Sequence, residues 1–276
     1  MNFDTLTNKK RLFVIGCSFT NYLWPTWADI LALDLDITYI NLGRSGAGNQ
    51  YISNRIVQAH LEYKFTKDDI VIIQWSNMLR EDIFLSDDWV TPGNFFTSTW
   101  FEDKFKLYKE VPVKWFILRD FFTIYTIQEF FKNKKCCFIQ FKMQNFLDLD
   151  AYQQNSHLET EMDFLKSLYD KYFNLDETIL PSFFEILWDN NISNKGEQCT
   201  ELGIIQNWHP TVSEHFKYIS KVLNHKFKST TKVSVEKAQI EWESIVLNNK
   251  PPKIQPKKDY IQLLDKLQPL FERIKL

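Results

Sequence analysis

Two potential nucleophiles, Cys17 and Ser18, stand side by side where an apolar run ends in a glycine, in the stretch RLFVIGCSFT. A serine in a tight turn after a strand offers both its hydroxyl and its own backbone N–H at the edge of a sheet. Further along, the glycine-rich stretch NLGRSGAGN, which holds Gly43, Gly46 and Gly48, lets a backbone N–H approach a ligand closely because glycine has no side chain. These residue types suit nucleophilic acyl chemistry.

Two further polar residues complete such a set. Asn77 follows the apolar run DIVIIQWS, and its side-chain amide is a third hydrogen-bond donor beside those of Ser18 and the glycine-rich stretch. Three donors that converge on one point form an oxyanion hole. Late in the chain, the stretch NWHPTVSEH supplies His209 and then His215, and a histidine can serve as the general base that activates Ser18. Pro210 is expected to fix the start of the helix that follows His209.

The elements that must position these residues are short buried strands alternating with helices. Continuous apolar runs predict strands at residues 11–16, 37–43, 69–76 and 136–142, and runs of this kind are typical of parallel strands covered on both faces. Helical patterns lie at 25–33, beginning with Pro25, at 49–63 and at 113–134. This alternation predicts an α/β fold with a doubly wound, flavodoxin-like parallel sheet in three α/β/α layers. Ligands of such sheets bind beyond the carboxyl ends of the strands.

Two regions depart from the simple repeat. An insertion at about residues 84–112 is rich in Trp and Phe, and burial against the domain is favoured over sugar stacking as its explanation. Residues 8–228 are therefore predicted to form one α/β domain, and residues 229–276 a C-terminal helical extension with helices at 233–248 and 259–275. The extension is expected to cap the core, with self-association into a homo-oligomer as the alternative.

Composition excludes several classes of protein. The formal net charge of -2 argues against a nucleic-acid partner. The sequence contains no run of 18 apolar residues, so no membrane span is expected. The four cysteines lack zinc-ligand spacing, and neither a metal site nor a dinucleotide-binding fingerprint is expected. The first residues lack the pattern of a signal peptide, so the expected location is cytoplasmic.

Four blocks in order resemble the SGNH (GDSL) hydrolase superfamily. VIGCSFT resembles the first block, NLGRSGAGN the second, IVIIQWSN the third and NWHPT the last. The resemblance implies that Ser18 is the nucleophile, Gly46 and Asn77 are oxyanion-hole donors, and His209 is the base. Cys17 replaces the aspartate that is usual after the glycine of the first block, and its side chain is expected to pack in the core on the side opposite to Ser18.

The acid of the family's triad is missing from its usual place, three residues before the histidine. Gln206 occupies that position and Asn207 follows it. Three alternatives stay open: a Ser-His dyad whose imidazole is oriented by a carbonyl or amide oxygen, a more distant acid such as Asp189 or Glu201, or loss of hydrolytic activity.

The resemblance implies acyl-ester chemistry on small acyl groups, often acetyl, carried by carbohydrates or similar alcohols. Transfer to water would make the protein an esterase or deacetylase that needs no cofactor. Transfer to a sugar hydroxyl would make it an O-acetyltransferase with acetyl-CoA as donor. Arg44 and Arg80 lie near the predicted site and either contact an anionic substrate or are simply solvated. The alternative function is a catalytically weak or inactive SGNH-like protein that binds glycans.

Overall fold

The computed structural model describes residues 9–94, 112–147, 158–173, 175–190 and 209–248. Its main sheet has four parallel strands in the order β2-β1-β3-β6. They are β1 (Arg11–Ile15), β2 (Thr38–Asn41), β3 (Asp69–Trp75) and β6 (Cys137–Lys142). Each coincides with a predicted strand, and the strand order confirms the doubly wound, flavodoxin-like sheet.

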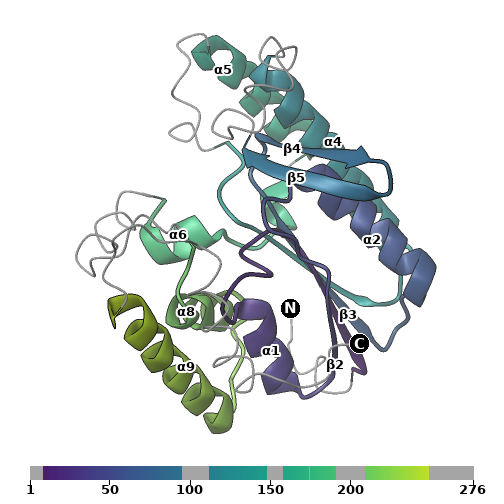
Figure 1. The fold of residues 1–276 in the computed structure, drawn as a ribbon. Helices are drawn as coiled ribbons and strands as arrows, with labels where there is room; N and C mark the ends of the chain where they lie inside the picture. Colours follow the sequence, from purple (N-terminus) through teal and green to yellow (C-terminus); the bar gives the residue numbers. More distant parts are fainter. Residues whose placement is uncertain (1–8, 95–111, 148–157, 174, 191–208, 249–276) are drawn as a thin grey trace.

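Helices cover both faces of this sheet, which gives the expected three layers (Figure 1). One layer contains α1 (Trp27–Leu35), α8 (Val212–Val222) and α9 (Ser229–Asn248), and the other contains α2 (Asn49–Tyr63) and α4 (Val113–Lys132). Two shorter helices extend these layers: α5 (Leu158–Leu168) contacts α4, and α6 (Phe183–Trp188) contacts α8.

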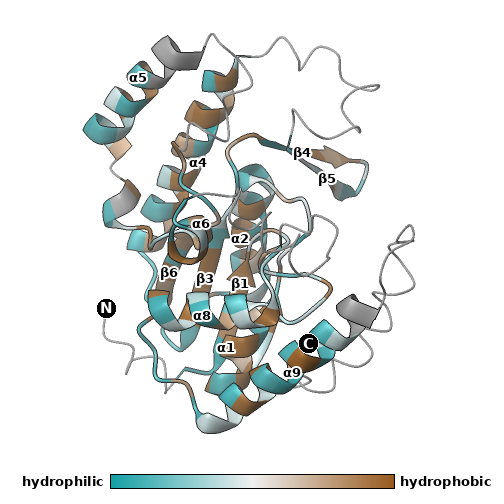
Figure 2. Cartoon of the chain, turned by 90° about the vertical axis from the view of Figure 1, so that its left-hand side faces the viewer, coloured by the Kyte–Doolittle hydropathy of each residue, from teal (hydrophilic) through white to brown (hydrophobic). Residues whose placement is uncertain are grey.

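The core lies between the sheet and the helices. Every residue of β3 is buried, and Figure 2 shows the strands of the main sheet in brown, the colour of hydrophobic residues, behind the helices. Aromatic side chains join the layers: the Trp27 ring meets that of Phe141 edge-on at 4.7 Å, and Phe183 stacks on Tyr218 at 3.5 Å. Such burial is the main source of stability in a domain of this size.

The helix predicted to begin at Pro25 begins instead at Trp27. Thr26 is its N-cap, accepting a hydrogen bond from the backbone N–H of Ala28, and the Asp29 carboxylate accepts one from the backbone N–H of Thr26 at 2.8 Å. This capping box satisfies donors at the helix end, so it sets the boundary in place of the proline.

A β-hairpin that sequence analysis does not predict follows β3. Its antiparallel strands are β4 (Arg80–Leu85) and β5 (Asp88–Asn94), with an irregular register near Glu81. The departure from the simple repeat therefore begins at residue 80 rather than 84, and residues 95–111 lie outside the described part of the chain.

The described part of the C-terminal extension is α9, which begins at Ser229 and packs against α1 and α8. Its Trp242 ring lies edge-on to Trp24, with ring centroids 5.7 Å apart. Asp34 of α1 accepts hydrogen bonds from His225 and from the backbone N–H of Lys228, just before α9 starts. The helix predicted at 259–275 lies outside the described residues. None of the described helices combines the length and apolar character that crossing a membrane requires.

Candidate active site

The turn that carries Ser18 is built by contacts on both sides of it. The backbone N–H of Thr20 donates to Cys17 O at 2.9 Å, closing a turn directly after Gly16. The Thr20 hydroxyl donates a hydrogen bond to Gln74 Oε1 of β3 at 2.5 Å. A Cβ on Gly16 would lie only 2.1 Å from the oxygen of this hydroxyl. Only glycine therefore allows Thr20 to anchor the turn to the neighbouring strand.

The two neighbouring nucleophiles have different surroundings. Cys17 is fully buried, with its Sγ 3.8 Å from Met143 Sδ, as the sequence predicts for a packing residue. Ser18 is 3% exposed. Among the described residues, neither its hydroxyl nor its backbone N–H has a hydrogen-bond partner, so both are available to a ligand.

Gly46 lies at the third position of a type II turn from Arg44 to Ala47, which the hydrogen bond from Ala47 N–H to Arg44 O closes at 3.1 Å. Its φ is +78°, and a Cβ would lie 2.2 Å from the backbone oxygen of Thr91 in β5. The Thr91 hydroxyl also donates to Ser45 O at 2.8 Å, so the turn lies directly on the hairpin. Within the described residues, the backbone N–H of Gly46 donates no hydrogen bond.

The side-chain amide of Asn77 has a defined orientation. Its Oδ1 accepts a hydrogen bond from the backbone N–H of Leu79 at 2.7 Å, and Asn77 is 7% exposed. Because Oδ1 is held by a backbone donor, Nδ2 must point the other way, and it has no acceptor within the described residues. Asn77 therefore presents a free N–H donor.

The loops after the first three strands are joined to one another. Arg44 N–H donates to Gly16 O at 3.0 Å, and the side-chain amide of Asn21 donates to Gly43 O at 2.9 Å. Arg80 Nη1 donates to Ala47 O at 3.0 Å. This bond joins the loop of residues 43–48, called the glycine loop below, to the segment after β3. The free donors of these loops thus lie at the carboxyl edge of the sheet, where the strand order reverses between β1 and β3.

His209 lies against the segment that follows Ser18. Its ring stacks on Tyr22 with centroids 3.7 Å apart and planes 12° apart, and it is 5.6 Å from Phe19. Trp24 Nε1 donates to Pro210 O at 2.8 Å, which fixes the backbone beside the histidine. No hydrogen bond joins Ser18 and His209 within the described residues.

The helix after His209 starts later than its proline predicts. It is α8, which begins at Val212 with Thr211 as N-cap and Glu214 completing a capping box. His215 is fully buried in this helix and lies edge-on to Phe183 at 5.5 Å, so it packs in the core.

Most of the residues considered as partners that could orient His209 lie outside the described chain. Gln206, Asn207 and Glu201 are not among the described residues. Asp189 is described: it is exposed, ends α6 in the left-handed conformation, and makes no hydrogen bond to His209.

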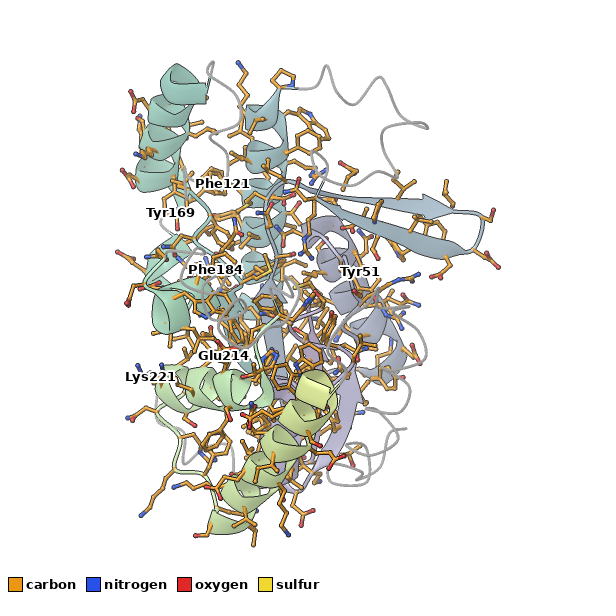
Figure 3. The ribbon with its side chains drawn as sticks, turned by 60° about the vertical axis from the view of Figure 1, so that its left-hand side comes forward. Tyr51, Phe121, Tyr169, Phe184, Glu214 and Lys221 are labelled. Atoms are coloured by element: carbon orange, nitrogen blue, oxygen red, sulfur yellow. The ribbon has the colours of Figure 1, made fainter. Side chains whose placement is uncertain are left out.

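The hairpin supplies a cap to α2 that the sequence analysis missed. Asp82 accepts hydrogen bonds from Gly48 N–H and Tyr51 N–H, both at 2.8 Å. Its carboxylate lies 2.8 Å from where a Gly48 side chain would begin, so it replaces the capping side chain that glycine lacks. Burial raises the pKa of Asp82 to about 6. Tyr51 is labelled in Figure 3, where it lies beside the hairpin.

The two arginines predicted to contact substrate, Arg44 and Arg80, both form hydrogen bonds with other residues of the chain. Arg44 forms a bidentate ion pair with Asp88 of the hairpin, with N–O distances of 2.8 and 3.1 Å. Arg80 binds Ala47 O, and its Nη2 lies 3.9 Å from Met143 Sδ. Substrate contact by either arginine stays a prediction. No group of three or more His, Cys, Asp or Glu side chains arranged to hold a metal ion occurs in the described part of the chain.

No family model matches the sequence, and neither does any curated protein. Among solved structures, the fold is similar to a protein assigned to the lipolytic G-D-S-L family from Desulfitobacterium hafniense, with 17% identity, a TM-score of 0.40, and coverage of 78% of this chain and 98% of that one. A member of the same family from Veillonella parvula matches with 14% identity, a TM-score of 0.39, and coverage of 78% and 97%.

Proposed function

We propose that the protein performs serine-dependent acyl-ester chemistry through an acyl-enzyme on Ser18. The observation that carries the proposal is the set of three unengaged donors, Ser18 N–H, Gly46 N–H and Asn77 Nδ2, on joined loops at one edge of the sheet. Buried donors normally find acceptors within the protein. Ser18 and Asn77 are buried, so their free donors, together with that of the half-buried Gly46, support binding of an anionic ligand atom.

In the proposed reaction, the Ser18 hydroxyl attacks the ester carbonyl while His209 takes its proton. The carbonyl oxygen becomes an oxyanion held by the three donors. Collapse of this intermediate breaks the ester bond, and His209 returns the proton to the departing alcohol. Water, or a sugar hydroxyl, then attacks the acyl-enzyme by the same steps in reverse and releases Ser18. Water as acceptor makes the protein an esterase or deacetylase; a sugar acceptor makes it an O-acetyltransferase.

A second candidate is glycan binding without turnover. It is favoured by the ring of His209, which lies flat on Tyr22 and makes no hydrogen bond to Ser18. The first candidate does not require this hydrogen bond in the unliganded protein, because catalytic hydrogen bonds are often absent before substrate binds.

Intact-mass measurement after mixing with p-nitrophenyl acetate tests the proposal. We expect an acetyl adduct on wild type and on Cys17→Ala, and none on Ser18→Ala, with the modified residue assigned by peptide mapping. An adduct that requires Cys17 instead of Ser18 would overturn the assignment. Absence of both adduct and p-nitrophenol release, together with binding of acetylated oligosaccharides, would favour the second candidate. Adding a sugar acceptor to the acetylated protein then separates transfer from hydrolysis.

A further inference from the structure

A fully buried asparagine, Asn49, holds the backbone next to Asn77. Asn49 is the first residue of α2, and its Oδ1 accepts a hydrogen bond from Ser76 N–H at 2.8 Å. Its Nδ2 donates to Ser76 O at 3.3 Å. Strand β3 ends at Trp75, so Asn49 supplies to Ser76 both of the bonds that a neighbouring strand would otherwise provide.

A buried carboxylate fixes the orientation of this amide. Asp120 of α4 is fully buried and accepts a hydrogen bond from Asn49 Nδ2 at 2.7 Å. Its other oxygen accepts from Arg119 Nε at 2.9 Å. The Ser76 backbone N–H can only donate, so Oδ1 of Asn49 must face Ser76, and the Asp120 carboxyl holds Nδ2 on the other side of the amide. The amide cannot be reversed without losing both contacts.

The ion-pair network around Asp120 is itself anchored to the hairpin. Arg119 Nη1 binds Glu81 Oε2 at 2.5 Å, and Nη2 donates to Arg80 O at 2.9 Å. Burial raises the pKa of the Asp120 carboxyl, and the adjacent Arg119 offsets part of this rise, so that the pKa is about 7. A buried polar network whose members are paired holds its side chains in one arrangement.

We propose that Asn49 is a positioning residue that sets the distance between two oxyanion-hole donors, Gly46 N–H and Asn77 Nδ2. Asn49 follows the glycine loop directly along the chain, and it holds the peptide next to Asn77 through space. The two donors come from loops after different strands, and Asn49 connects those loops. This inference rests on the proposed function, because it assigns the donors to an oxyanion.

A double-mutant cycle of Asn49→Ala and Asn77→Ala tests the inference, with p-nitrophenyl acetate as substrate. Loss of an oxyanion-hole donor costs roughly 10²-fold or more in kcat, which is the expectation for Asn77→Ala. A misplaced catalytic group costs up to about 10²-fold, so we expect Asn49→Ala to lower kcat by about 10- to 10²-fold with little change in KM. The double variant should be about as active as Asn77→Ala alone, because Asn49 acts through Asn77.

Gln50→Ala is the matched control. Gln50 is the next residue of α2, and its Nε2 donates to Thr123 Oγ1 of α4 at 2.6 Å. This variant removes a contact between the same two helices without touching Ser76, so kcat should be unchanged. If Asn49→Ala does not fold, Asp120→Asn takes its place in the cycle, since Asp120 binds Asn49 Nδ2 directly at 2.7 Å. The Asp120→Asn variant should also lower kcat, and combining it with Asn77→Ala should cause no further loss in kcat.

The outcomes separate the inference from the proposed function. A wild type without Ser18-dependent acetylation would overturn both. A wild type that is acetylated at Ser18, with losses from Asn49→Ala and Asn77→Ala that multiply, would overturn the inference alone. Equal losses in Asn49→Ala and Gln50→Ala would do the same, because they would show a general effect of the α2–α4 contact.

Discussion

The rings of His209 and Tyr22 lie in parallel planes, with centroids 3.7 Å apart and an angle of 12° between them. Tyr22 also meets Trp24 edge-on at 4.6 Å, and Trp24 binds Pro210 O, so the histidine is fixed both at its ring and at its backbone. The stacking leaves the edge of the imidazole, with its two nitrogen atoms, outside the ring-to-ring contact.

We predict that Tyr22→Ala lowers kcat by roughly 10-fold, because loss of the stacked ring lets His209 turn away from Ser18. Tyr22→Phe keeps the ring and should retain most of the activity. Steady-state kinetics of both variants measures the difference. Comparable losses in the two variants would instead assign the effect to the Tyr22 hydroxyl.

Asn77→Asp should abolish most activity while preserving the fold. The aspartate keeps an oxygen for the Leu79 N–H bond of 2.7 Å but replaces the Nδ2 donor by a second oxygen. The expected loss in kcat is about 10²-fold or more. Kinetics and circular dichroism together check this, and kcat within a few-fold of wild type would show that Asn77 does not contact the oxyanion.

Gly46→Ala and Gly93→Ala form a matched pair for stability. Both glycines have positive φ, +78° and +91°, which costs an alanine about 1–2 kcal/mol. A Cβ on Gly46 would also meet Thr91 O at 2.2 Å, whereas one on Gly93 meets nothing within 4 Å. Urea denaturation should therefore show a larger loss for Gly46→Ala, and equal losses would contradict the close contact of the glycine loop with the hairpin.

Asp34 should contribute to acid sensitivity. Burial alone would raise its pKa, but hydrogen bonds from His225 and Lys228 N–H outweigh burial and lower the pKa below the ordinary 3.8. The ionised carboxylate therefore stabilises the fold above about pH 4, and this stabilisation is lost as the pH falls through the lowered pKa. Denaturation midpoints of Asp34→Asn should fall less steeply with acid than those of wild type; parallel profiles would contradict the assignment.

The main sheet is predictable from sequence because its parallel strands are buried on both faces and therefore read as continuous apolar runs. The hairpin is not predictable in the same way. Strand β4 begins with three charged residues, Arg80, Glu81 and Asp82, and β5 contains Pro92 and Gly93, a pattern typical of a loop. Contacts distant in sequence override these local preferences: Asp82 binds the start of α2, and Glu81 binds Arg119.

The site is predictable only in part. The residue types of Ser18, Gly46 and Asn77 and their positions after strands are visible in the sequence. Their free donors are not, because they depend on which neighbouring groups are already paired. The role of Asn49 likewise depends on Asp120, which lies on a helix distant in sequence. The helix starts were a missed local signal, since Thr26 and Thr211 each have an acid three residues later.

The Asp82 cap also implies an order in which the chain can fold. The first turn of α2 obtains its cap from a carboxylate 34 residues further along the chain, so this turn cannot be complete until the hairpin has formed and docked. Closing such a loop costs conformational entropy before any contact repays it. The glycine loop and the start of α2 should therefore be among the last parts to gain protection in refolding, after the parallel strands have paired.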